Sequence, residues 1–113
     1  MHIIRNQQMN TMKQHKAQIF NKKACFFLKQ NYPTKTSELS DRRLDAMVSE
    51  GVQRSEKYNI KSERCVIAFL EFMFSLSFDF DSNPRTLWTK NILSDTGLKE
   101  EEKIMKIIDT LKE

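Results

Sequence analysis

Oxygen-bearing side chains occupy every second position of one segment, at Asp79, Asp81 and Asn83. This alternation resembles the start of a calcium loop of the EF-hand type, which also needs a glycine at position 6 and a bidentate glutamate at position 12. Counted from Asp79, position 6 is Pro84 and position 12 is Lys90. The segment lacks both the flexible turn and the closing carboxylate, so the sequence predicts no calcium site here.

A turn followed by a helix start accounts for the same residues. Asn83 is a typical N-cap residue, and Pro84 suits the first helical position, where its missing amide would be unpaired in any case. We therefore predict that Asp81, Ser82 and Asn83 are turn and capping residues. Asp79 and Asp81 are also the only pair of carboxylates placed for acid and base catalysis, but neighbours in an irregular loop are more often solvated acceptors.

The remaining reactive side chains lack the spacing that catalysis or metal binding requires. His2 and His15 have no cysteine or histidine at zinc-ligand spacing, and Cys25 and Cys65 do not form a C-x-x-C pair. No glycine-rich phosphate loop and no G-x-S-x-G motif occurs. The sequence predicts a protein that is not an enzyme, binds no metal and no cofactor, and keeps both cysteines reduced.

Aromatic side chains around the same segment indicate a different role. If Phe78 and Phe80 alternate with the two aspartates in extended chain, they cannot all point inward. Aromatic residues beside an arginine make the strongest contacts in protein interfaces. We therefore predict a partner-binding surface made by Phe78, Phe80, Arg85 and Trp88, although most of the aromatic residues in this region are expected in the core.

The composition favours an all-α fold. The chain has 113 residues, which suits one domain, and only two glycines and two prolines, too few for the many turns of a sheet protein. We predict a single helical domain over residues 1–113, a bundle of about five helices around a central apolar helix. No run of about 18 apolar residues and no signal peptide is present, so we expect no membrane segment and a cytoplasmic location.

Hydrophobic periodicity divides the chain into helices. The central one is the apolar segment from Cys65 to Leu76, for which a buried strand is the competing interpretation. Gly51, inside the second helix, indicates close approach to a neighbour, and residues 34–40 are expected to form a loop. The predicted helices span residues 6–31, 40–58, 65–76, 84–95 and 99–113, and Ile104, Ile107, Ile108 and Leu111 form the inner stripe of the last.

The first helix is the basic part of a chain whose formal net charge is +4. Clustered lysines attract phosphate without regard to sequence, so a nucleic-acid-binding regulator is one alternative. Arginine, the usual reader of guanine edges, occurs near this helix only at Arg5. We therefore predict weak, salt-sensitive binding to DNA and no sequence-specific recognition.

The segment from Tyr58 to Leu93 resembles a group of small bacterial proteins encoded near type VI secretion spike and effector genes. The shared pattern is Y-G-I, then S/T-E-R-D-V, an aromatic and L-M-F segment, F-D-x-D-P, W and I-L, with weaker similarity at Gln7, Gln8 and Met9 and in the final helix. The chain departs from it at four positions, where Asn59, Cys65, Ser77 and Asn83 replace glycine, aspartate, glycine and aspartate.

This resemblance implies a genomic setting and no catalytic residues. The function that we predict is a non-enzymatic accessory protein, an adaptor or co-chaperone, that binds a secreted type VI effector, its chaperone or a spike component. An immunity protein that neutralises a toxin is the nearest alternative, because both roles need only a complementary protein surface. The oligomeric state is left open.

Overall fold

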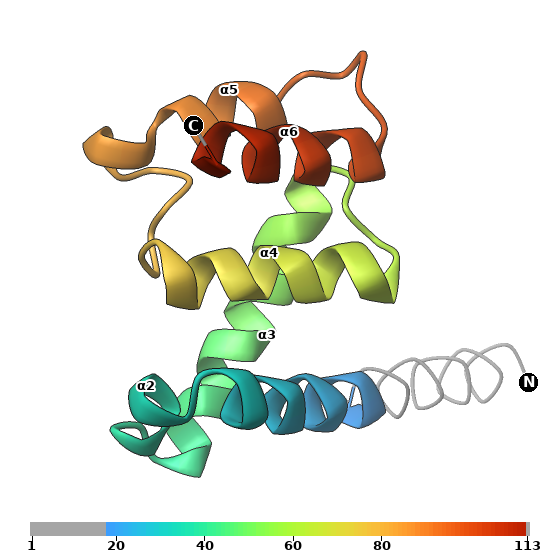
Figure 1. The fold of residues 1–113 in the computed structure, drawn as a ribbon. Helices are drawn as coiled ribbons and strands as arrows, with labels where there is room; N and C mark the ends of the chain where they lie inside the picture. The colour runs from blue at the N-terminus through green and yellow to red at the C-terminus, as the bar shows by residue number, and fades with distance from the viewer. Residues whose placement is uncertain (1–17, 113) are drawn as a thin grey trace, which may run out of the picture. The chain divides into compact units, whose positions relative to one another are not determined.

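The computed structural model describes residues 18–112, and these form helices joined by turns, with no strand among them (Figure 1). The all-α prediction is confirmed. The part of the first predicted helix before residue 18 lies outside the described residues, as do Gln7, Gln8 and Met9. A first helix over residues 18–31 is followed by α2 (Pro33–Ser37), α3 (Asp41–Lys57), α4 (Glu63–Ser75), the 3-10 helix η1 (Pro84–Thr86), α5 (Trp88–Leu93) and α6 (Glu100–Lys112).

The contacts fall into two compact units, and the division lies between Val48 and Ser49 within α3. The prediction of one domain over residues 1–113 therefore stays a prediction. In the first unit the buried apolar side chains are Ala24, Leu28, Leu44 and Val48.

Helix α2 occupies a stretch that the sequence predicted to be a loop, and that prediction is wrong. The first helix ends at residue 31 as predicted, but Pro33 is the first residue of α2, where a proline loses no hydrogen bond. The carbonyl of Tyr32 accepts from the amide of Thr36 at 3.0 Å, and the hydroxyl of Thr36 donates to the same carbonyl at 2.8 Å. A first residue with a fixed φ and the backbone bond from Thr36 together form one short helix.

Helix α4 is the apolar centre of the second unit. It begins at Glu63 after the cap Ser62, whose hydroxyl accepts from the amide of Cys65 at 3.4 Å. The strand alternative for this segment is excluded. More than half of its side chains are buried, namely Cys65, Val66, Phe69, Leu70, Phe72, Met73 and Phe74, which is the pattern expected of a helix that is hydrophobic on most sides.

Gly51 allows α3 to approach α4 closely, as its position in the sequence suggested. A Cβ atom built at residue 51 would collide with Cδ2 of Leu70 and would lie 2.7 Å from Sδ of Met73. No larger residue fits without a shift of these side chains, so the glycine sets the distance between the two helices.

Helix α6 contacts both α4 and α5. The carboxylate of Glu100 accepts from the amides of Lys61 and Ser62, each at 3.0 Å, and these bonds hold the pKa of Glu100 below its usual value. The ammonium group of the buried Lys103 donates to the carbonyl of Tyr58 at 2.7 Å. The start of α6 is thereby fastened to the turn that precedes α4.

The apolar stripe predicted for the last helix is only partly buried. Ile104 and Ile107 are buried and Ile108 is half-buried, but Leu111 is 43% exposed. Leu111 lies one residue before the helix ends, where the stripe is no longer covered.

Candidate functional site

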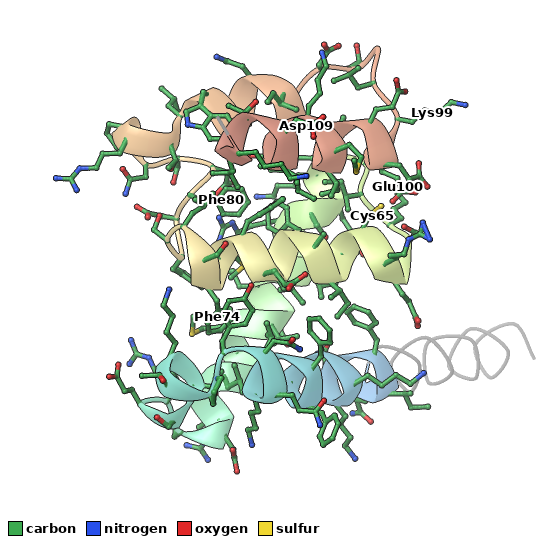
Figure 2. All side chains as sticks on the ribbon, viewed as in Figure 1. Cys65, Phe74, Phe80, Lys99, Glu100 and Asp109 are labelled. Carbon is green, nitrogen blue, oxygen red and sulfur yellow. The ribbon has the colours of Figure 1, made fainter. Side chains whose placement is uncertain are left out.

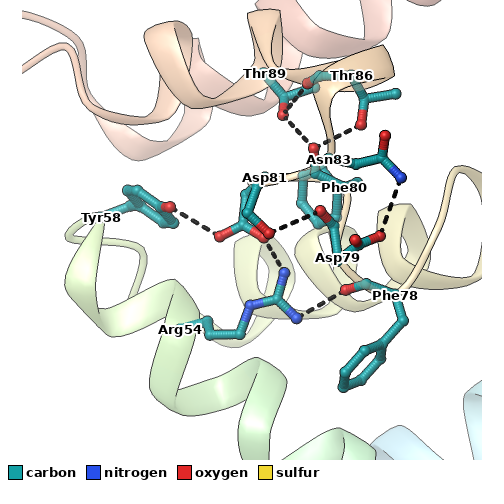
Figure 3. A network of polar contacts seen from close by, with 10 residues as sticks. Arg54, Tyr58, Phe78, Asp79, Phe80, Asp81, Asn83, Thr86 and Thr89 are labelled. Atoms are coloured by element: carbon teal, nitrogen blue, oxygen red, sulfur yellow. Dashed lines mark hydrogen bonds and ion pairs between the residues drawn. The ribbon is translucent and has the colours of Figure 1, made fainter.

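The segment between α4 and η1 is held by a network of polar contacts centred on Arg54 of α3 (Figure 3). The guanidinium group of Arg54 donates to the carbonyl of Phe78 at 2.8 Å and forms an ion pair with the carboxylate of Asp81. The central carbon of the guanidinium group, Cζ, also lies 5.4 Å from the ring centroid of Phe78 and 5.9 Å from that of Phe80, within the range of a cation–π interaction.

Asp81 lies in a turn, as predicted, but it caps no helix, and its side chain is the acceptor at the middle of this network. One oxygen of its carboxylate is bound by Arg54, and the other accepts from the hydroxyl of Tyr58 at 2.8 Å. Burial and, after it, the bond to Asp81 raise the pKa of Tyr58 to about 12. Both carboxylate oxygens are occupied, so the arrangement fixes the path of the chain.

Phe80 is fully buried, and the prediction that it contacts a partner is therefore wrong. Its ring packs edge-on against Phe69 of α4, with centroids 5.0 Å apart, and against Phe72 at 5.7 Å; Figure 2 shows it directed toward α4. The backbone from residue 78 to residue 82 forms turns instead of extended chain. The inward and outward alternation assumed from the sequence does not apply in turns.

The start of η1 is fixed by side chains that bind backbone groups. The carbonyl of Phe80 accepts from the hydroxyls of Thr86 at 2.7 Å and Thr89 at 3.1 Å. Asn83 caps η1 as predicted, because its side-chain oxygen accepts from the amide of Arg85 at 2.9 Å. The Asn83 amide group also binds Asp79, which lowers the pKa of that exposed carboxyl.

The other predicted partner residues do not form one patch. Phe78 is 38% exposed, and Figure 3 shows its ring on the Arg54 side of the segment, away from Thr86 and Thr89. Arg85 is exposed on η1, and Trp88 is half-buried at the first residue of α5. Arg85 and Trp88 thus lie three residues apart, on η1 and at the start of α5, whereas Phe78 lies in the turns before η1.

Leu87 was missed by the sequence reasoning. It lies between η1 and α5 and is 46% exposed, more than Phe78. Because α5 and α6 run side by side in opposite directions, the start of α5 is near the end of α6, where Leu111 is exposed (Figure 1). The signal available in the sequence was the position of Leu87, two residues before Thr89 and six before Leu93, which puts it on another side of the helix from these two residues. We call Arg85, Leu87 and Trp88 the η1 surface.

Other chemistry can be described only for residues 18–112. Within this range no three His, Cys, Asp or Glu side chains are grouped as metal ligands would be. None of its helices has the length and apolarity to cross a bilayer. Cys25 and Cys65 are both free thiols, half-buried and buried respectively, and burial, followed by the charge of Asp45, raises the pKa of the Cys25 thiol.

Asn59 has a backbone φ of 61°, the only positive value at a non-glycine residue in the described part of the chain. Asparagine tolerates this left-handed conformation better than most residues, and glycine tolerates it best. This is the position at which the resembled bacterial pattern has glycine.

The comparisons of the chain with protein-family models, curated proteins and solved structures found no match, so the resemblance stays a prediction.

Proposed function

We propose that this protein is a non-enzymatic accessory that binds another protein through the η1 surface. The observation that supports this is the exposure of Leu87 at 46% between exposed Arg85 and half-buried Trp88. Tryptophan and arginine are the residue types most enriched among interface residues that contribute strongly to affinity.

The η1 surface is also preorganised. Asn83 caps η1, and the hydroxyls of Thr86 and Thr89 fix the chain on both sides of Leu87 through the carbonyl of Phe80. A surface that is already ordered loses less conformational entropy on binding than a mobile loop does. This makes a small apolar patch sufficient for a specific contact.

The finer proposal concerns the partner. The resemblance of residues 58–93 to proteins encoded near type VI secretion genes favours a secreted effector, its chaperone or a spike component. The protein would then act as an adaptor or co-chaperone, and neutralisation of a toxin partner in a growth assay would instead identify it as an immunity protein.

The test is binding of the purified full-length protein to the products of the neighbouring genes, measured by calorimetry. A Leu87→Ser and Trp88→Ala double variant is expected to weaken binding about thirtyfold or more, since such truncations typically cost about 2 kcal/mol or more. Met105→Ser is the matched control, because Met105 is 53% exposed on α6.

Because Trp88 is half-buried, its substitution could unfold the protein, so the thermal melt of the double variant must be recorded. A second double variant, Arg85→Ala with Leu87→Ser, changes only exposed residues. Loss of affinity in either variant with the fold retained supports the proposal. Full affinity in a folded double variant, or an equal loss in Met105→Ser, contradicts the assignment of the η1 surface.

A further inference from the structure

The first helix carries the most exposed large apolar side chain of the described residues. Phe26 is 64% exposed, and Ile19, seven residues earlier, is 42% exposed. Residues seven apart lie on the same side of a helix, two turns from each other. Ile19 and Phe26 therefore lie on one exposed side of the helix.

The core-facing side of this helix is a different one. Ala24 and Leu28 are fully buried, and at 3.6 residues per turn they lie nearly opposite Ile19 and Phe26. The exposed pair is therefore a separate apolar stripe, not the margin of the buried face.

Lysines border this stripe on both sides. Lys22 and Lys23 precede Phe26 by four and three residues, so they lie on either side of the line from Ile19 to Phe26, and both are exposed. The helix from residue 18 to residue 31 contains no Asp or Glu. Within residues 18–112, Lys22 and Lys23 form no ion pair, whereas Lys29 is paired with Asp41 at 2.7 Å.

We propose that Ile19, Lys22, Lys23 and Phe26 form a second docking surface, which binds an acidic amphipathic helix of a partner protein. Apolar side chains of that helix would cover Ile19 and Phe26, and its carboxylates would face the two lysines. An apolar centre with a charged border is the usual composition of a protein interface, and an amphipathic helix presents both features from one face. This inference does not rest on the η1 surface, because it uses other residues in the other unit.

Three other occupants fit less well. Nucleic acid would leave Ile19 without a contact, and residues 18–31 contain no arginine. A membrane-bound helix needs a wide apolar face, whereas this stripe has two apolar side chains. A second copy of the chain offers α6 as its most acidic helix, but Glu100 there is already bound to Lys61 and Ser62, and the same helix carries three lysines.

The test is fluorescence anisotropy with a labelled synthetic helical peptide that carries leucines on one face and glutamates beside them. Phe26→Gln in the full-length protein is expected to weaken binding about thirtyfold. Lys22→Gln with Lys23→Gln is expected to weaken it about tenfold at low salt and less at high salt, because exposed charges are screened. Lys106→Gln with Lys112→Gln, two exposed lysines of α6, is the matched control and should bind normally.

Each contrary outcome is distinguishable. The proposal is overturned if the peptide does not bind the wild type, if Phe26→Gln binds as tightly as the wild type, or if a peptide with lysines in place of glutamates binds equally well. Binding of a DNA duplex or of phosphatidylserine vesicles that is lost with Lys22→Gln and Lys23→Gln but kept in Phe26→Gln would assign the lysines to a polyanion instead. A wild-type dimer that Phe26→Gln dissociates would identify a second copy as the occupant. Circular dichroism verifies that the variants remain helical.

Discussion

Removal of the Asp81 carboxylate is expected to lower the free energy of unfolding of the second unit by about 3–5 kcal/mol, the usual cost of leaving one member of a buried ion pair alone. The side chains of Asp81 and Arg54 are only 10% and 15% exposed. In Asp81→Ala the guanidinium group keeps the carbonyl of Phe78 and its aromatic neighbours but loses its anion, and the hydroxyl of Tyr58 loses its acceptor. A domain has about 5–15 kcal/mol of stability in total, so the loss is readily measured.

The same measurement can separate the pair from its surroundings. Arg54→Ala should cost a similar amount, and the double variant should cost about 2 kcal/mol less than the sum of the two, because the second substitution removes a group that the first has already left unpaired. Urea unfolding followed by fluorescence is suitable, since Trp88 is the only tryptophan and lies in the second unit.

The exposed ion pair between Lys29 and Asp41 is the control. Their side chains are 49% and 88% exposed, so Asp41→Ala should leave the urea midpoint unchanged. The reasoning is refuted if Asp81→Ala is no more destabilising than Asp41→Ala, or if the two effects in the Arg54 and Asp81 cycle are simply additive.

Three further predictions concern the contacts around α4. Gly51→Ala should destabilise the protein by about 1–3 kcal/mol in urea unfolding, because crowding against Leu70 outweighs the gain of about 1 kcal/mol in helix propensity; a more stable variant would contradict the close approach. Tyr58 has a pKa raised from 10.0 to about 12 in the folded state, so its contribution to stability is fully present below pH 10 and is lost as the pH rises toward 12. The ultraviolet titration difference between the wild type and Tyr58→Phe measures this, and a phenolate that forms near pH 10 would be the contrary result. The pKa of Glu100 is lowered in the folded state, so its contribution to stability is present above its unfolded pKa of about 4.5 and is lost as the pH falls below that value. The difference in melting temperature between the wild type and Glu100→Gln should therefore shrink in acid. A difference that stays constant would show that the carboxylate charge is not involved.

Local signals in the sequence were sufficient for most of the helices. Asn83 is a cap in the structure as predicted, and the apolar segment predicted as the central helix forms the most buried helix. Helix α2 was missed because residues 34–40 were interpreted as a loop. The helix has five residues, too few to show the apolar spacing from which the other helices were predicted.

The candidate site was predicted less well, because its contacts join segments far apart in the chain. Arg54 and Asp81 are 27 residues apart, and no local pattern pairs them. Phe80 was assigned to the surface on the assumption of extended chain, but turns at residues 78–82 direct it into the core. Of the η1 surface, the sequence singled out Arg85, which is exposed, and Trp88, which is half-buried, but it missed Leu87 between them. Their binding role stays a prediction.

The bonds that hold the segment before η1 have an evolutionary consequence. Several of them end on the carbonyl oxygens of Phe78, Asp79 and Phe80, and a carbonyl is present whatever the side chain. Substitution of the exposed residues at positions 78 and 79 would therefore keep these bonds and would remove only the contact of the Phe78 ring with Arg54 and the bond from Asn83 to the Asp79 carboxylate. Arg54 and Asp81, which supply side chains to the network, do not have that freedom, so in homologous chains they should change together or not at all.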